Sequence, residues 1–254
     1  MIAALVKGGA MGACLLLGAA LPRDAGQRLI NRDLILNLLN GAILVLVVGQ
    51  GVAWVDAHSA IGLVALPSES PDWLCLLVAF VVIDFFRYWL HRAHHRVPWL
   101  WPFHRVHHSA ERLDATTGLR MHVVDFIQLS LLPVLLFKVI LDTSAWPEWV
   151  LLVALGIGVV MDAFQHSNLR WNPDHPAAKV WNLALNHPLF HSWHHTRDGV
   201  RCDGNYGNAL VIWDRLFGSD VTEGAPPELM GLESDQALTN SLMGWHLLRR
   251  PADR

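Results

Sequence analysis

Residues 73–95, WLCLLVAFVVIDFFRYWLHRAHH, join an apolar run to a cluster of histidines. The run from Trp73 to Leu90 is close to the roughly 20 residues with which a helix crosses about 30 Å of hydrocarbon. His91 and His95 follow at once, and residues four apart on a helix lie on one face. The stretch therefore predicts a membrane helix that brings two imidazoles to the edge of the bilayer.

Two further clusters contain three histidines each at the spacing HxxHH. They are His104, His107 and His108, and then His191, His194 and His195. All but His58 and His246 of the 15 histidines lie between His91 and His195. On a helix, positions three and four apart are neighbours, so we expect the imidazoles of each cluster to point one way. The clusters predict a metal centre, and they offer more nitrogen donors than one ion needs, which favours two ions.

The composition is that of a membrane protein. Charged residues make up 16% of the 254 residues, hydrophobic ones 53%, and the mean hydropathy is +0.32. No basic patch with interleaved aromatic residues is present, so nucleic acid is not expected as a partner. The cysteines, Cys14, Cys75 and Cys202, are odd in number and lack CxxC spacing, and we interpret them as small hydrophobic core residues.

Apolar stretches also occupy residues 1–21, 34–55, 123–141 and 149–164. The first could be a cleaved signal peptide or a retained helix. We favour a retained helix, because a cleaved signal would place the histidines outside the cell, against the charge pattern described next. The fold class expected is an all-α integral membrane protein, a bundle of about four to five transmembrane helices with a cytoplasmic cap that carries the histidine clusters.

Basic residues are distributed unevenly among the connections. Residues 22–33, residues 91–122 and the C-terminal tail are rich in Arg, whereas residues 56–72 and 142–148 contain no Lys or Arg. The positive-inside rule then predicts an outside N-terminus, five spans and a multi-pass protein whose histidine clusters all face the cytoplasm. Pro98 and Pro102 are expected to break the helix between the first two clusters.

We expect one integrated domain with three parts. Residues 1–66 form N-terminal membrane helices, residues 73–222 form the histidine-bearing catalytic region with its own membrane helices, and residues 223–254 form a cytoplasmic tail. Within the tail, residues 242–248 have the pattern of an amphipathic segment that lies on the surface.

The three clusters resemble the HxxxH, HxxHH and HxxHH boxes of the fatty acid hydroxylase and sterol desaturase superfamily, which are membrane di-iron oxygenases. The resemblance covers about residues 84–218. Besides the boxes it rests on Asp84, Tyr88, Trp89, Arg92, Leu100-Trp101, Phe103, Arg120-Met-His122, His166-Ser-Asn168, Pro188, Asn205-Tyr-Gly207, Trp213-Asp214 and Phe217-Gly218.

The resemblance implies two iron ions and adds candidates to their ligands. Histidines alone do not name the metal, since imidazole also suits copper, nickel and zinc. His166 is a ligand candidate beside the box residues, and His122 is a further one, although Val123 follows it where the family commonly has Pro. The expected ligands are His91, His95, His104, His107, His108, His166, His191, His194 and His195, with His122 as the additional candidate. We interpret His94, His175 and His187 as structural histidines.

Three carboxylates are candidates for orienting the ligands from behind, because a metal-bound histidine usually donates its second N–H to a carboxylate or carbonyl. Asp84 lies seven residues before His91, and Asp162 four before His166, so each can share a helix face with its histidine. Pairing of Asp84 with Arg87 is an equal alternative. Asp214 is the third candidate, through the resemblance.

The resemblance implies an enzyme that uses O2 to hydroxylate or desaturate an unactivated C–H position of a lipid or sterol-like substrate taken from the bilayer. No GxGxxG follows a strand, so electrons from NAD(P)H would arrive through a separate reductase or carrier. Two other classes remain open, a membrane haem protein of electron transport and a metal carrier without oxygenase activity. Haem ligation would place single histidines inside separate spans, and transport would place polar residues along a pathway at mid-membrane.

Overall fold

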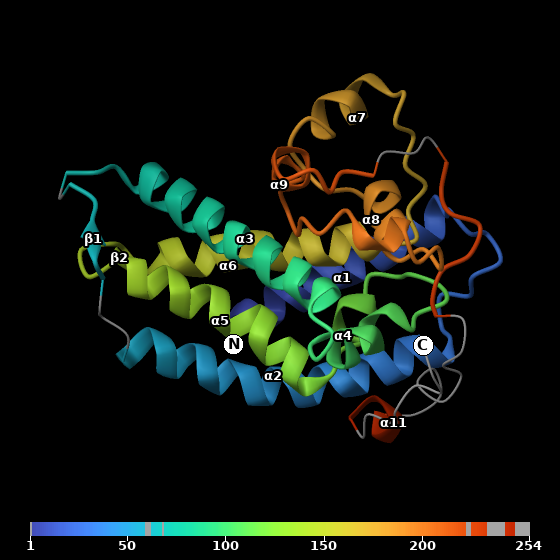
Figure 1. Cartoon of the computed structure of the whole chain (residues 1–254), viewed down its shortest axis with the longest axis horizontal. Coiled ribbons are helices and arrows are strands. Elements are labelled where there is room, and N and C mark those ends of the chain that lie inside the picture. The colour runs from blue at the N-terminus through green and yellow to red at the C-terminus, as the bar shows by residue number, and fades with distance from the viewer. Residues whose placement is uncertain (1, 59–61, 68, 222–224, 233–241, 247–254) are drawn as a thin grey trace.

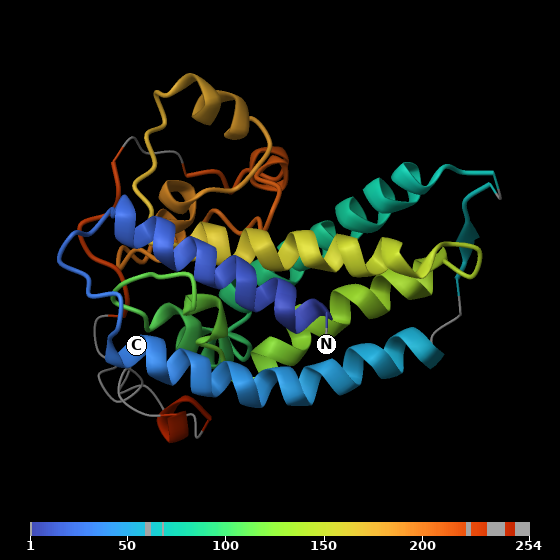
Figure 2. The ribbon, with the colours of Figure 1, turned by 180° about the vertical axis from the view of Figure 1, so that it is seen from behind.

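Long helices run side by side along the molecule and coincide with the apolar stretches of the sequence (Figures 1 and 2). The computed structural model describes residues 2–58, 62–67, 69–221, 225–232 and 242–246. The long helices are α1 (Ile2–Ala20), α2 (Arg32–His58), α3 (Asp72–Arg96), α5 (Val123–Ile140) and α6 (Glu148–His166). The prediction of a helical bundle is confirmed.

Successive helices run in alternating directions, so the connections gather at two ends of the bundle. Residues 21–31, 97–122 and 167–221 lie toward one end, on the right in Figure 1. At the opposite end the two-residue strands β1 (Val64–Ala65) and β2 (Leu141–Asp142) pair in parallel, with Val64 opposite Leu141. The Arg-rich connections therefore share the end that carries the histidines.

The centre of the bundle is the packing of α3 against α5 and α6. Buried residues on α3 recur four apart, two of them small, and small side chains let helices approach closely where hydrocarbon surrounds them. The buried cluster contains Cys75, Ala79 and Ile83 of α3 with Phe137, Leu141, Val150 and Ala154. This packing fixes where the end of α3, with its histidines, lies relative to the ends of the other helices.

The outer surface of these helices is apolar. Helices α3, α5 and α6 are long and apolar enough to cross a membrane, and only 28 to 39% of each apolar window is buried inside the protein. Exposed large side chains include Trp73, Leu77, Trp149 and Leu152. Such a surface fits lipid rather than water. The chain is an integral membrane protein; α1 adds a shorter apolar stretch, and the total of four to five spans stays a prediction.

The predicted break between the first two histidine clusters is confirmed. Val97 adopts an extended conformation (φ −101°, ψ 113°) before Pro98, as the residue before a proline favours. Pro102 then lies in the first turn of α4 (Trp101–His108), where its missing N–H costs no helical hydrogen bond. The chain thus turns from α3 into α4 within a few residues, which brings the second cluster back toward the first.

Short elements complete the histidine-bearing end of the molecule. They are the 3₁₀ turns at Thr117–Leu119 and Arg201–Asp203, and the helices α7 (Pro176–Trp181), α8 (Pro188–His194), α9 (Ile212–Leu216) and α11 (Leu242–His246).

The C-terminal helix α11 is docked against the bundle rather than lying on its surface. Trp245 is fully buried against Val106 of α4, and the Arg120 guanidinium lies 4.7 Å from the centre of its ring. The expected surface segment is therefore wrong at Trp245, while residues 247 and 248 lie outside the described residues. A large aromatic ring gains more from a packed cavity than from water.

Candidate metal centre

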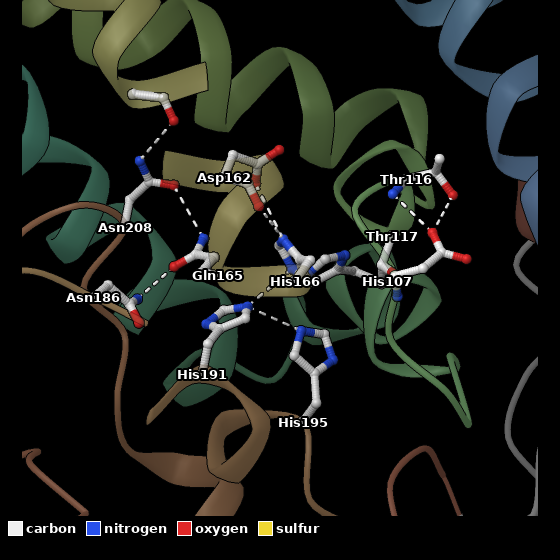
Figure 3. Close-up of polar contacts among 12 residues, drawn as sticks. His107, Thr116, Thr117, Asp162, Gln165, His166, Asn186, His191, His195 and Asn208 are labelled. Atoms are coloured by element: carbon white, nitrogen blue, oxygen red, sulfur yellow. Dashed lines mark hydrogen bonds and ion pairs between the residues drawn. The ribbon is translucent and has the colours of Figure 1, made fainter. Parts of the chain in front are cut away.

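Nine histidines converge into two groups at the end of the bundle. His91, His95, His104, His108 and His194 form the first group, and His107, His166, His191 and His195 form the second. In each group the nitrogen atoms that could bind an ion lie within 4.8 Å of one another. Figure 3 shows the second group, with rings from three helices facing one point. The structure thus brings together all nine of the principal candidates.

Each HxxHH cluster is divided between the two groups. His104 and His108 of α4 face the first group while His107 faces the second, and on α8 His191 and His195 face the second group while His194 faces the first. The expectation that each cluster points one way is therefore wrong. At about 100° per residue, positions three apart are displaced by about −60° and positions four apart by about +40°. One helix can therefore serve two ions.

The arrangement of hydrogen bonds in the first group calls for a cation. His91 Nδ1–H donates to the Tyr206 carbonyl at 2.8 Å, and His104 Nδ1–H donates to the Asp125 carboxylate at 3.1 Å. A neutral ring that carries its proton at Nδ1 presents a lone pair at Nε2. These two Nε2 atoms face each other at 3.0 Å. A positive ion beside them relieves the repulsion between the lone pairs.

The second group has the same character. His166 Nδ1–H donates to the Asp162 carbonyl at 2.7 Å, so its Nε2 also presents a lone pair. That atom lies 3.1 Å from His107 Nε2 and 2.9 Å from His191 Nε2. Nitrogens about 2.1 Å from one ion and about 90° apart would be about 3.0 Å from each other. The spacing therefore fits neighbouring ligands of a transition metal.

Several buried ring nitrogens have no hydrogen-bond partner within the described part of the chain. They are both nitrogens of His95, Nδ1 of His107, His191 and His195, and Nε2 of His108 and His194. A buried polar atom without a partner costs about 1–3 kcal/mol. A metal ion would provide a partner for the nitrogens that face the centre of each group. The nitrogen donors present therefore fit a metal site.

The histidines of α4 and α8 are neutral at pH 7. Burial, followed by repulsion from neighbouring histidines, holds the pKa values of His104, His107 and His108 well below 6.5. The pKa values of the three histidines at 191, 194 and 195 are lowered in the same way. Neutral imidazole is the form that binds metals.

Asp125 contacts the site although the sequence did not single it out as a partner of a ligand. It is completely buried in the first turn of α5, and both of its oxygens lie 3.1–3.2 Å from His104 Nδ1. It also lies 3.4 Å from His94 Nε2. Its signal in the sequence is a carboxylate within an apolar stretch, a costly placement that usually marks function.

The loop from Gly204 to Gly207 orients the first group through its backbone. The Gly204 carbonyl accepts from His194 Nδ1 at 2.8 Å, as the Tyr206 carbonyl does from His91. Asn205, between them, has a left-handed backbone (φ 56°), and its amide contacts Phe190 O and Val221 O. A β-carbon at Gly207 would meet the Leu210 carbonyl and the Asp214 carboxylate, so only glycine fits.

The three predicted carboxylates have different surroundings. Asp162 contacts His166 mainly through its carbonyl, with a carboxylate oxygen 3.5 Å from Nδ1. Among the described residues Asp84 contacts no histidine, because it accepts from the Ala209 and Leu210 amides and the Trp213 indole. Its carboxylate joins α3 to the loop before α9.

Asp214 acts on the first group through the backbone loop. It accepts from the Tyr206 and Gly207 amides at 2.8 Å and from the Ser219 hydroxyl at 2.7 Å. Burial raises the pKa of Asp214 to about 6. The Tyr206 carbonyl accepts from His91, so Asp214 positions His91 indirectly, through the backbone of Tyr206.

Four other histidines considered from the sequence lie outside both groups. His122 begins α5, where its Nδ1 accepts from the Val124 amide and its ring lies beside Phe103. His94 hydrogen-bonds Leu90 O and Gln128 Oε1. His175 and His187 accept from backbone amides at the starts of α7 and α8. Each of these four histidines makes local contacts with the protein, and none belongs to the two groups of converging nitrogens.

Comparison with known proteins agrees with this arrangement. The family model described as "Fatty acid hydroxylase" matches residues 76–219, which contain both histidine groups. The chain belongs to the fatty acid hydroxylase family. This places it in the fatty acid hydroxylase and sterol desaturase superfamily, as the resemblance of the boxes indicated.

This member of the fatty acid hydroxylase family is similar to curated proteins whose names refer to lipid substrates. An alkylglycerol monooxygenase of Xenopus tropicalis is 34% identical over 63% of this chain and 33% of its own length. A fatty acid hydroxylase of a Lecanicillium species is 32% identical over 58% of this chain and 42% of its own. An ornithine lipid hydroxylase of Rhizobium tropici is 31% identical over 60% and 44%. The matches thus span less than half of these relatives. No solved structure matches the chain significantly.

Proposed function

We propose that this chain is an O2-dependent oxidoreductase that hydroxylates or desaturates an unactivated C–H position of a membrane lipid at a centre of two iron ions. One observation carries the proposal: nine histidines, seven of them buried, form two adjacent groups, with ring lone pairs facing one another in each. Two groups, of five and four nitrogens, match a requirement for two ions.

Iron supplies the chemistry that the side chains lack, because it can pass electrons to O2 and so drive cleavage of a C–H bond, which redox-inert zinc cannot do. The first group of histidines would hold one ion and the second group the other. Asp125 and the carbonyls of Tyr206, Gly204 and Asp162 would fix the ring orientations and tautomers of the ligands.

The position of the histidines supports a lipid substrate. Helix α3 runs without interruption from the apolar surface at Trp73 into His91 and His95, so the centre lies where the apolar helices end. An acyl chain or sterol-like molecule could reach it from the hydrocarbon. The relatives named as alkylglycerol monooxygenase and ornithine lipid hydroxylase support a lipid class.

We place the histidine-bearing end on the cytoplasmic side. The Arg-rich connections gather at this end, and the opposite connections contain no Lys or Arg. NAD(P)H and its reductases are cytoplasmic, so a separate electron carrier docking on this face would supply the electrons that reduction of O2 requires. Haem binding would need one histidine in each of two spans. Here the ring nitrogens cluster at one end of the bundle, which favours the proposed function over haem binding.

Lipid mass spectrometry of cells with and without the gene tests the proposal. We expect a lipid that gains the mass of one oxygen atom, or loses two hydrogens, only in cells with the intact protein, and about two irons per purified chain. A His107→Ala variant should abolish the product, whereas His175→Ala, which removes only the cap of α7, should retain it. A haem absorption band, or unchanged lipids together with zinc as the bound metal, would refute the proposal.

A further inference from the structure

A groove beside the second histidine group has the chemistry of a lipid-binding site. Its inner pocket, of about 110 Å³, lies between the end of α1 and the turn at residues 114–115. Its outer pocket, of about 330 Å³, lies between residues 26–33 and Arg112. Gln27, Arg28 and Asp114 line both pockets, so the two form one groove.

The two halves of the groove differ in polarity. The inner pocket is lined largely by apolar or small side chains, including Cys14, Leu15, Ala19 and Ala115. The outer pocket is lined by three arginines, Arg28, Arg32 and Arg112. An amphiphile with an apolar chain and an anionic headgroup has the same two halves.

Arg112 pairs with the Asp24 carboxylate at 3.5 Å and donates to the Gly26 carbonyl at 3.3 Å, whereas, within the described part of the chain, the acidic residues that line the outer pocket do not engage Arg28. Asp33 is paired with the buried Arg120 at 3.3 Å, and Asp114 Oδ1 accepts from the Thr116 amide and hydroxyl. Among the described residues, no hydrogen bond or ion pair engages the Arg28 guanidinium. Arg28 is therefore available for an anion, and guanidinium groups suit phosphate and carboxylate oxygens.

A second polar atom of the groove lacks a partner in the part of the chain that the structure describes. It is the buried Oε1 of Gln27, which can accept a hydrogen bond from a hydroxyl of a bound molecule. The first turn of α2, at Arg32 and Asp33, also borders the outer pocket, and its backbone dipole favours negative charge there. The groove therefore offers donors to an anion and an acceptor to a hydroxyl.

The groove opens at the level where lipid headgroups would lie. Leu29 and Ile30 are 43% and 73% exposed between Arg28 and Arg32, and on α1 Leu16 is 66% exposed. Apolar side chains flanked by arginines are typical of the membrane interface. A lipid could therefore enter the groove from the bilayer with its headgroup beside the arginines.

The inner end of the groove adjoins the metal centre. Asn168, which lines the inner pocket, follows His166 by two residues. The Asp114 amide donates to Thr117 Oγ1 at 3.0 Å, and the 3₁₀ turn at Thr117–Leu119 packs against α4 and α6, the helices that carry His107 and His166. A headgroup held here would place its acyl chain close to the second histidine group.

From these observations we infer that the groove of Arg28, Arg32 and Arg112 binds the anionic headgroup of the lipid whose chain is oxidised. The identity of this lipid as the substrate rests on the proposed function, whereas its binding in the groove does not. The inference narrows the substrate class to lipids with a negatively charged headgroup, and it makes the arginines specificity-determining residues.

Binding is tested first without turnover, under nitrogen and without a reductant. Phosphatidic acid with a fluorescent acyl chain and diacylglycerol with the same chains are titrated with the purified full chain in neutral detergent, and the Kd values are compared. We expect phosphatidic acid to bind about tenfold more tightly. The double variant Arg28→Gln/Arg112→Gln should lose this preference, while Arg201→Gln, an exposed arginine outside the groove, should keep it.

Two binding results would overturn the inference. One is an equal affinity of the native chain for both lipids, and the other is a preference that survives in the double variant. Excess inorganic phosphate separates a lipid site from a site for free phosphate, because it should displace phosphatidic acid only weakly; full displacement at equal concentration would contradict a lipid site. Iron content of the double variant is measured alongside and should match that of the native chain.

The second arm asks which lipids gain an oxygen atom or lose two hydrogens in cells that express the protein. Products confined to anionic lipids, and reduced in the double variant, support the groove. Products confined to neutral lipids would overturn the headgroup assignment while the proposed function stands. Absence of any product, together with intact binding of phosphatidic acid, would instead refute the proposed function and leave a lipid-binding groove.

Discussion

The hydrogen bond from His104 to Asp125 offers the sharpest test of how the first metal position is built. Asp125 is completely buried and lies 3.1–3.2 Å from His104 Nδ1 through both oxygens. Replacing it with alanine leaves His104 free to rotate or to change tautomer. Loss of such a partner typically lowers metal affinity 10–100-fold, which is about 1.4–2.8 kcal/mol at about 1.4 kcal/mol per tenfold change.

Asp125→Asn gives a graded comparison, because an amide oxygen can still accept from His104 but carries no charge. A hydrogen bond to a charged group is worth about 1 kcal/mol more than a neutral one, so we expect about a fivefold loss of affinity. The assay is iron content of the purified protein during titration with a calibrated chelator, with Asp142→Asn in β2, at the opposite end of the bundle, as the control. An Asp125→Ala protein that folds and holds iron as tightly as the native chain would refute the reasoning.

Three further predictions concern other parts of the molecule. His107→Ala should lower iron from about two per chain toward one, because only the second group loses a ligand; elemental analysis that still finds two irons would contradict the grouping. Trp245→Ala should destabilise the protein by about 3–5 kcal/mol, since it empties a fully buried site; an unchanged thermal unfolding temperature in detergent would count against docking of α11. The metal-free protein should lose stability as the pH falls below about 6.5, because the unfolded chain takes up protons that His107 and its neighbours, with their lowered pKa values, do not accept when folded. Unfolding temperatures measured at pH 7.5 and 5.5 test the direction of this change. A higher unfolding temperature at pH 5.5 would contradict the prediction.

The helices and the nine converging histidines could be predicted from the sequence because each leaves a local pattern. Apolar runs give the long helices, and histidines four apart on one helix give pairs such as His91 and His95. The division of each HxxHH cluster between two groups was not predicted. It could have been inferred from helix geometry, because each residue is rotated by about 100° from the one before, so His107 and His108 point in different directions.

Partners that act through the backbone leave no such pattern. The carbonyls of Gly204 and Tyr206 orient His194 and His91, but every residue has a carbonyl, so nothing in the sequence distinguishes these two. Asp84 was matched to a histidine by its spacing along α3, yet the amides of Ala209 and Leu210, distant in sequence, take both of its oxygens. Long-range packing decides such choices, as it does for Trp245.

The way in which α4 and α8 each contribute to both histidine groups has a consequence for biosynthesis. The first group needs His194, and the second needs His191 and His195, so a nascent chain that ends before α8 contains neither complete set. Iron would then be acquired only after translation and insertion are nearly finished. Cells starved of iron should accumulate a fully synthesised apoprotein.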